Sequence, residues 1–181
     1  MNESNYLSFI PMETRMEIIR KNWLSHDARW QYTVLLEFGI EKSNQLNQDI
    51  IQEVGKIMMF RLINALDVSQ VTDLDEFQRV WSTAMNLYWP PPGFVYTFKR
   101  EASIFRVSVS RCMISENVIK AGIAQYYECG CSAMRTGWFE ALGVEADQKV
   151  EKCLKNGDNT CEIYWKVKAF SKMGESLEFF A

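Results

Sequence analysis

Cysteines are the residues of this chain whose type and spacing first suggest chemistry. All five lie within about the last 70 residues of the 181: Cys112, Cys129, Cys131, Cys153 and Cys161. Thiolates bind zinc and act as nucleophiles, whereas a neutral buried thiol behaves as a small apolar side chain. The first residues lack a cationic segment followed by an apolar run, so we expect a cytoplasmic location, where thiols stay reduced.

Cys153 and Cys161 are predicted to face each other across a hairpin. Asn156-Gly157-Asp158 is a typical turn sequence between two strand-like segments. A three-residue loop centred on Gly157 would place the two cysteines opposite each other, with Cβ atoms about 4.5–5.5 Å apart. The alternation of side chains along a strand then puts Glu151 on the same face as Cys153.

That face of the hairpin is predicted to point at the core, because its second strand alternates apolar residues after Cys161. Zinc in a structural site takes four thiolate, imidazole or carboxylate ligands. The candidate ligands are Cys129, Cys153, Cys161 and Glu151, with Cys131 as an alternative. The other interpretation is that these cysteines are buried small apolar residues.

His26 is the only histidine and therefore the only side chain that ordinarily titrates near neutral pH. A hydrolase could use His26 as a general base oriented by Asp27, with Arg29 or Arg135 holding a substrate carboxylate. The alternative is that His26 and Asp27 lie at the start of a helix whose tryptophans pack in the core. The sequence contains neither a Gly-x-Ser-x-Gly nucleophile motif nor a glycine-rich phosphate loop.

Aromatic residues gather around the only run of prolines. They could line an apolar pocket for a planar ligand, or they could be ordinary core residues. The candidate ligand-binding residues are Trp30, Arg29, Arg135 and Tyr96. The aromatic set near the prolines is Trp81, Tyr88, Trp89, Phe94, Tyr96 and Phe98.

Helical periodicity extends over the first half of the chain. Apolar spacing predicts helices over residues 12–24, from about 27 to Gly39, from 41 to 66, and from 73 to 88. Asp73 with Glu76 resembles a capping box for the last of these. Gly39 is predicted to end the second helix in a left-handed conformation.

The sequence Pro90-Pro91-Pro92-Gly93 marks the change from helices to strands. Alternating apolar residues predict a hairpin over about 94–109, Ser115 is a candidate cap for a following helix, and the cysteine hairpin comes last. We therefore predict an α+β fold in which N-terminal helices pack with an antiparallel sheet of two hairpins separated by helices. Residues 1–89 form a helical layer and 90–181 a hairpin–helix–hairpin unit, within one compact domain.

Composition excludes some classes of function. The net charge of −3 and the scattered Lys and Arg residues do not give the basic face that nucleic-acid binding needs. No apolar window approaches the roughly 18 residues of a membrane span. Hydrophobic residues make up 48% of the chain, enough for a sizeable core.

The residues from Gly130 to Trp165 resemble the end of 4-vinyl-reductase-like domains and of the related aminothiazoline carboxylate hydrolase-like family. The resemblance lies in Val150 to Cys153, the Asn156-Gly157-Asp158 turn and Cys161-Glu162-Ile163. In phenol-sensing members it implies a zinc held by three cysteines and a glutamate, beside an aromatic-ligand pocket. Here Val150 stands where the family carboxylate is expected.

The N-terminal part also has a resemblance. The sequence from Asn22 to Trp30, followed by Glu37-Phe38-Gly39, is similar to the opening of uncharacterised bacterial cytosolic proteins grouped with the hydrolase-like family.

Three functional hypotheses follow. The first is a small-molecule-binding domain, for an apolar or aromatic ligand, with a structural cysteine site that is a candidate for zinc. The second is a hydrolase of a small aminothiazoline- or cyclic-amide-like acid. The third is an interaction protein that forms a homodimer without catalysis.

Overall fold

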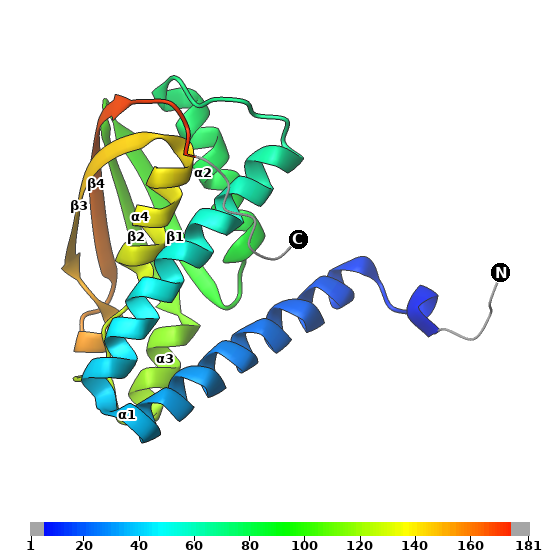
Figure 1. Cartoon of the computed structure of the whole chain (residues 1–181), viewed down its shortest axis with the longest axis vertical. Helices are drawn as coiled ribbons and strands as arrows, with labels where there is room; N and C mark the ends of the chain where they lie inside the picture. The colour runs from blue at the N-terminus through cyan, green and yellow to red at the C-terminus, as the bar shows by residue number, and fades with distance from the viewer. Residues whose placement is uncertain (1–5, 175–181) are drawn as a thin grey trace. The chain divides into compact units, whose positions relative to one another are not determined.

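The computed structural model describes residues 6–174, and its helices and strands form the α+β fold expected from the sequence (Figure 1). The chain divides into two compact units, Met1–Gln45 and Leu46–Ala181. The division falls inside the long helix α1 (Met12–Ala65), whereas the change from helices to strands comes later, after Pro90.

The first unit is helical. A short 3-10 helix, η1 (Tyr6–Phe9), precedes α1, and α1 runs without a break from Met12 to Gly39. The predicted helix boundary near His26 is wrong, because no Gly or Pro interrupts residues 12–38. The predicted end at Gly39 is confirmed: this residue has φ 79°, a conformation that glycine adopts without strain. Helical geometry then resumes as far as Ala65.

The second unit contains a four-stranded antiparallel sheet. Its strands are β1 (Phe94–Glu101), β2 (Ile104–Cys112), β3 (Val144–Lys152) and β4 (Cys161–Phe170). The strand order is β1-β2-β4-β3, so the two predicted hairpins join through the pairing of β2 with β4. This pairing brings the end of the first hairpin next to the start of β4, since Val109 lies opposite Cys161.

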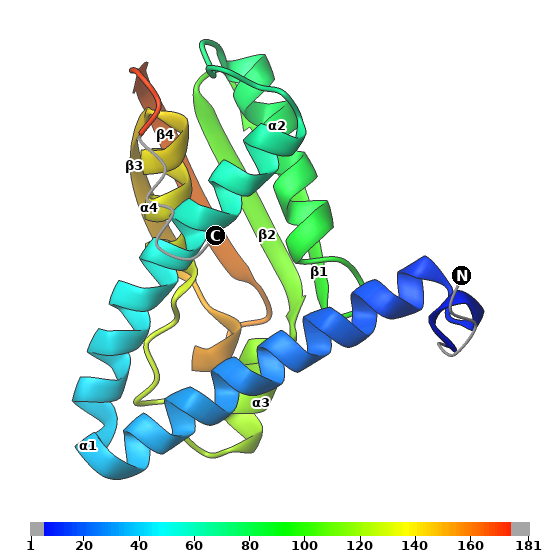
Figure 2. The same ribbon diagram turned by 45° about the vertical axis from the view of Figure 1, so that its right-hand side comes forward.

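Helices cover one face of this sheet. The part of α1 from residue 46 onward lies there together with α2 (Leu74–Tyr88) and α4 (Cys131–Leu142) (Figure 2). As predicted, Asp73 caps α2: its carboxylate accepts hydrogen bonds of 2.8 Å from the backbone N–H groups of Asp75 and Glu76. The remaining helix, α3 (Met113–Lys120), follows β2 directly, so Ser115 lies inside it and is not its cap.

Two glycines allow α1 and α4 to pack closely. A Cβ atom on Gly137 would collide with the backbone carbonyl of Gln52, and one on Gly55 would collide with that of Met134. This close contact fixes α4, and with it the position of Cys131 at its first turn.

The centre of the second unit is an aromatic cluster formed by α2, α4 and the sheet. Trp81 lies 4.7 Å from Trp138 and 4.5 Å from Trp165 between ring centroids, and Phe105 stacks on Trp165 at 5.7 Å. These side chains are almost wholly buried. Trp81, expected either to line a pocket or to belong to the core, is part of this packed cluster.

Candidate cysteine site

Four of the five cysteines come together at one end of the sheet. Cys129 and Cys131 lie just before α4 and at its first residue, while Cys153 follows β3 and Cys161 opens β4. The Sγ atoms of Cys129 and Cys131 are 3.2 Å apart, and those of Cys153 and Cys161 are 3.8 Å apart. The Cys129 thiol also interacts with the Cys153 sulfur, and this interaction connects the two pairs. We call these four residues the thiol cluster.

The loop between β3 and β4 holds two of these thiols in place. Its residues Leu154–Asn156 form a 3-10 turn, and Gly157 closes it with φ 92°. Asp158 Oδ2 accepts a 2.8 Å hydrogen bond from the backbone N–H of Cys153, and the N–H of Leu154 donates to Cys161 Sγ at 3.2 Å. The prediction that Cys153 and Cys161 meet is confirmed, whereas the three-residue loop is wrong, because residues 153–160 separate the two strands.

The thiols differ in their affinity for protons. Hydrogen bonding with Cys129 and Cys161 lowers the pKa of Cys153. The pKa of Cys129 is raised, first by its hydrogen bond to Cys131 and then by its interaction with Cys153, and the hydrogen bond that Cys161 donates to Cys153 raises the pKa of Cys161. The hydrogen bond from Cys129, with the charge of Arg135 in addition, lowers the pKa of Cys131 to about 7. The cluster therefore combines two sulfurs that ionise readily with two that keep their protons.

Glu151 does not join the thiol cluster. A bulge between Val150 and Lys152 interrupts the alternation of β3, and the Glu151 carboxylate is exposed and paired with Lys149 at 2.9 Å. Its predicted place on the core face is wrong, because the parity argument assumed an unbroken strand. The fourth member of the thiol cluster is Cys131 instead of Glu151.

The geometry of the cluster can be compared with a zinc site. Four ligands at 2.3 Å in a tetrahedron would place sulfur atoms about 3.8 Å apart. The distance between Cys153 and Cys161 matches this value, while Cys129 and Cys131 are closer because one donates a hydrogen bond to the other. Over residues 6–174, no group of three or more His, Cys, Asp or Glu side chains has an arrangement ready to hold a metal ion. The residues fit zinc in type and number, and binding would require that hydrogen bond to open.

Arg135 borders the thiol cluster from α4. It is 6% exposed, and its guanidinium donates hydrogen bonds to Gln148 Oε1 at 2.9 Å and Ser132 Oγ at 3.0 Å. Burial lowers its pKa, and the neighbouring cysteines oppose that change. The predicted ligand-binding residue Arg135 is thus a buried cation beside the thiols.

The other predicted site residues are on helix α1 and strand β1, elements that carry none of the four thiols. His26, Asp27, Arg29 and Trp30 are all on α1 in the first unit, which contains no cysteine. His26 is exposed, and burial raises the pKa of Asp27. Tyr96, on β1, donates its hydroxyl to Asn86 Oδ1 at 3.0 Å.

Buried indole groups form a feature that the sequence did not predict. The Nε1 atoms of Trp81, Trp138 and Trp165 are buried and have no hydrogen-bond acceptor among residues 6–174. Buried indole N–H groups normally find an acceptor. The aromatic cluster therefore contains three N–H donors that could each bind an acceptor atom of a ligand.

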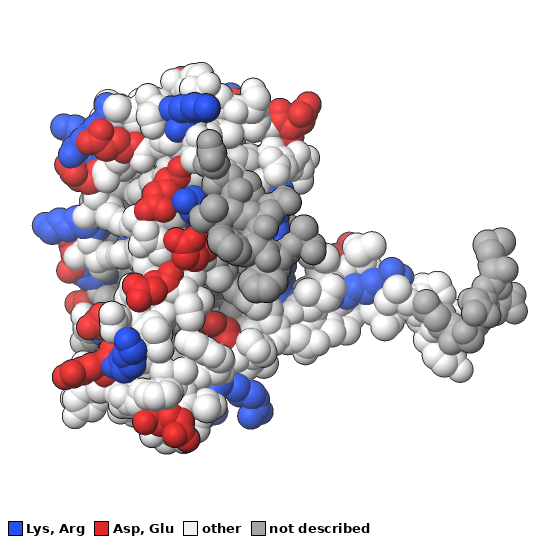
Figure 3. All heavy atoms as spheres, viewed as in Figure 1, with Lys and Arg blue, Asp and Glu red and all other residues white. Residues whose placement is uncertain are grey.

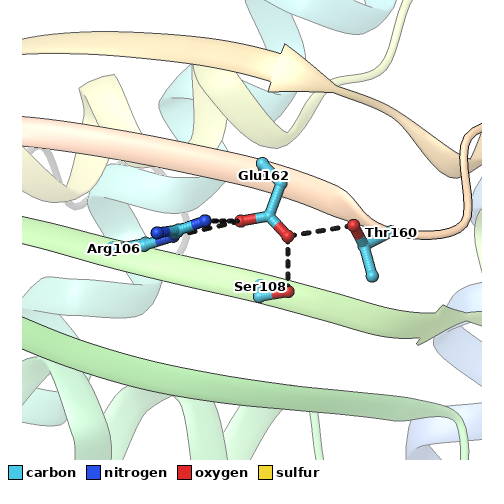
Figure 4. Close-up of polar contacts among 4 residues, drawn as sticks. All are labelled: Arg106, Ser108, Thr160 and Glu162. Atoms are coloured by element: carbon cyan, nitrogen blue, oxygen red, sulfur yellow. Dashed lines mark hydrogen bonds and ion pairs between the residues drawn. The ribbon is translucent and has the colours of Figure 1, made fainter.

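A polar cluster on the opposite face of β4 was also missed (Figure 4). The Glu162 carboxylate accepts hydrogen bonds from the hydroxyls of Ser108 at 2.7 Å and Thr160 at 2.9 Å, and it pairs with Arg106 at 3.1 Å. The Ser108 hydrogen bond, with those from Thr160 and Arg106, lowers the pKa of Glu162. A charged residue between the apolar Cys161 and Ile163 was the available signal.

The charged surface and the helices add two observations. Lys and Arg side chains are interspersed with Asp and Glu on the face drawn in Figure 3. Among the helices that the structure describes, none is both long and apolar enough to cross a bilayer.

Comparison with known proteins identifies a fold and no family. Neither protein-family models nor curated proteins match the sequence. The crystal structure of a trafficking protein particle complex subunit 3 from Naegleria fowleri, covalently bound to palmitic acid, is similar with a TM-score of 0.62. The match covers 88% of this chain and 99% of that one at 11% identity. At that identity, the likeness is one of fold.

Proposed function

We propose that this chain is a small-molecule-binding domain in which zinc, held by Cys129, Cys131, Cys153 and Cys161, clips one end of the sheet to α4. The convergence of four thiols from three chain segments is the observation that carries this proposal. The proposed ligand set replaces Glu151 by Cys131. When bound, zinc would supply a structural cross-link between segments that are separated in sequence.

The charges of the cluster support zinc as the ion. Two sulfurs that ionise readily provide initial ligands, and Arg135 compensates part of the negative charge that four thiolates would bring. Cys131 also lies at the N-terminal end of α4, where the helix dipole favours a thiolate.

Metal analysis of the purified protein tests this proposal. After equilibration with zinc and removal of free metal, we expect about one zinc per chain in the wild type and strong loss in Cys131→Ser. Cys112→Ser is the matched control, because Cys112 is buried near the cluster and does not hydrogen-bond to its thiols. A metal-free wild type, or equal loss in the two variants, would contradict zinc binding.

The three indole N–H groups support the ligand part of the proposal. A small apolar molecule with a carbonyl or carboxylate oxygen could accept from Trp81, Trp138 or Trp165 while its remainder packs on the rings. The similar trafficking-complex subunit is bound to palmitic acid, which combines these two properties. Opening of the ring cluster would have to accompany binding, since the rings contact one another.

Tryptophan fluorescence measures this binding directly. Titration with palmitic acid below its micelle concentration should change the emission of the wild type saturably, and Trp165→Phe, which removes one N–H donor, should weaken binding several-fold. Trp23→Phe, in the first unit, is the control. A change in emission that does not saturate, or a loss of binding that both variants share, would contradict binding of palmitic acid at the aromatic cluster.

The remaining hypotheses stay predictions. The 4-vinyl-reductase-like resemblance, the cytoplasmic location and the hydrolase with His26 and Asp27 have gained no further support. The homodimer is taken up below.

A further inference from the structure

An apolar stripe lies exposed on α1 within the first unit. Met12, Met16, Ile19 and Trp23 are spaced by four, three and four residues, which is the repeat of a coiled-coil seam. Met12 is 61% exposed, Met16 42% and Ile19 62%, while Trp23 is half-buried. We call these four residues the N-terminal stripe.

The residues beside the stripe favour a protein partner over a bilayer. Glu13 and Glu17 alternate with Arg15 and Arg20, so the flanks carry both signs of charge. Helices that lie in a membrane surface instead have a basic polar face. Met, aromatic residues and Arg are enriched at protein interfaces.

The charges also select how a second copy would pair. In a parallel pair, Arg15 would lie against Arg20 of the other copy, which is repulsive. In an antiparallel pair centred between Glu17 and Ile18, Met16 packs against Ile19 and Met12 against Trp23. Glu13 of each copy then lies beside Arg20 of the other, and the pair contains two such contacts.

Neighbouring antiparallel registers are less favourable. Moving the centre to residue 21 places Arg20 against its own counterpart and Glu13 against Asp27. Moving it further, between residues 24 and 25, pairs Arg20 with Asp27 but places Met16 against Thr33 and Met12 against Glu37, so polar residues enter the seam. The register centred between residues 17 and 18 is the one that uses the exposed part of the stripe.

We infer that α1 forms an antiparallel homodimer through the N-terminal stripe, with Glu13 of each copy paired to Arg20 of the other. The partner is a second copy of this chain, because the stripe is complementary to itself in both apolar layers and charge. This inference does not rest on zinc or on a bound ligand.

Analytical ultracentrifugation of the full chain over a range of concentrations tests the inference. We expect the wild type to dimerise and Met16→Glu to weaken association by about tenfold or more, since it buries a charge in the seam. Ile18→Glu is the matched control: Ile18 is 46% exposed on the same helix but lies outside the stripe, and its change should leave association unaltered. Circular dichroism shows whether each variant retains its helix content.

Charge reversal tests the register. Arg20→Glu should weaken an antiparallel dimer, and Glu13→Arg combined with Arg20→Glu should restore it. In a parallel dimer, Arg20→Glu would instead strengthen association by facing Arg15. A monomeric wild type overturns the inference even if it binds anionic phosphatidylserine vesicles, as does a dimer that Met16→Glu leaves intact or that the double reversal fails to restore.

Discussion

The two faces of the sheet at strand β4 differ in whether their polar groups have hydrogen-bond partners. On the outer face, the Glu162 carboxylate has three protein donors, from Arg106, Ser108 and Thr160. On the inner face, the Cys161 thiol donates to the Cys153 thiol, and the Trp165 indole N–H has no acceptor in the part of the chain that the structure describes.

This difference shows where binding capacity remains. A carboxylate whose hydrogen bonds are satisfied stabilises the fold and has little left to offer a ligand. The thiols that share protons and the three indole donors are the groups to which we propose that a metal ion and a small molecule bind. The proposed function therefore lies on the inner face, although the outer face carries the more obvious ion pair.

Truncation of adjacent residues on the two faces should give the largest contrast. Trp165→Ala removes a side chain that is 1% exposed at the centre of the aromatic cluster, and we expect a loss of about 3–5 kcal/mol in the free energy of unfolding. Tyr164→Ala, on the outer face, should cost about 1 kcal/mol. Denaturant unfolding measures both, and equal losses would contradict the assignment of the core to one face.

The pH dependence of zinc binding tests whether the thiols of the inner face are the metal ligands. Cys129 and Cys161 have raised pKa values and must release their protons to a metal. These two released protons alone make the apparent affinity rise about a hundredfold between about pH 6 and pH 7, and Cys131, whose pKa is about 7, adds to the rise. Competition with a chromophoric chelator at several pH values measures this rise, and a pH-independent affinity would exclude coordination by these thiols.

Removal of the buried cation should have a smaller effect. Arg135→Met leaves the hydrogen bond from Cys129 to Cys131 but removes the positive charge beside it, so we expect the pKa of Cys131 to rise. The ultraviolet absorbance of thiolate, followed against pH, measures this change. Arg106→Met on the outer face is the control, and the same titration curve for both variants would show that Arg135 does not act on the thiols.

The smallest effect is expected on the outer face itself. Glu162→Gln removes a charge but keeps a similar shape, and we expect a loss of about 1 kcal/mol near neutral pH. Because the folded-state pKa of Glu162 is lowered, this stabilisation is present above about pH 4.3 and disappears as the pH falls through the lower folded value. Thermal unfolding of both proteins at pH 7 and pH 3 tests this; a difference that persists unchanged at pH 3 would point to packing instead of charge.

Local patterns in the sequence were sufficient for much of the fold. Asp73 and Glu76 predicted the start of α2, Gly39 predicted the interruption of α1, and alternating residues predicted both hairpins. These features depend on near neighbours in the chain. The predictions failed at Glu151, where a bulge reversed the side-chain parity of β3, and at His26, where the helix continued.

The sequence by itself determined the α+β class, the two hairpins and the meeting of Cys153 with Cys161, because each follows from short-range periodicity or from a turn. Only the tertiary structure decided that Cys129 and Cys131 join them, since that requires α4 to pack against α1 through Gly55 and Gly137. The same packing buried Arg135 beside the thiols and left three indole donors without an acceptor among the described residues. The spacing of residues along the chain specifies neither outcome.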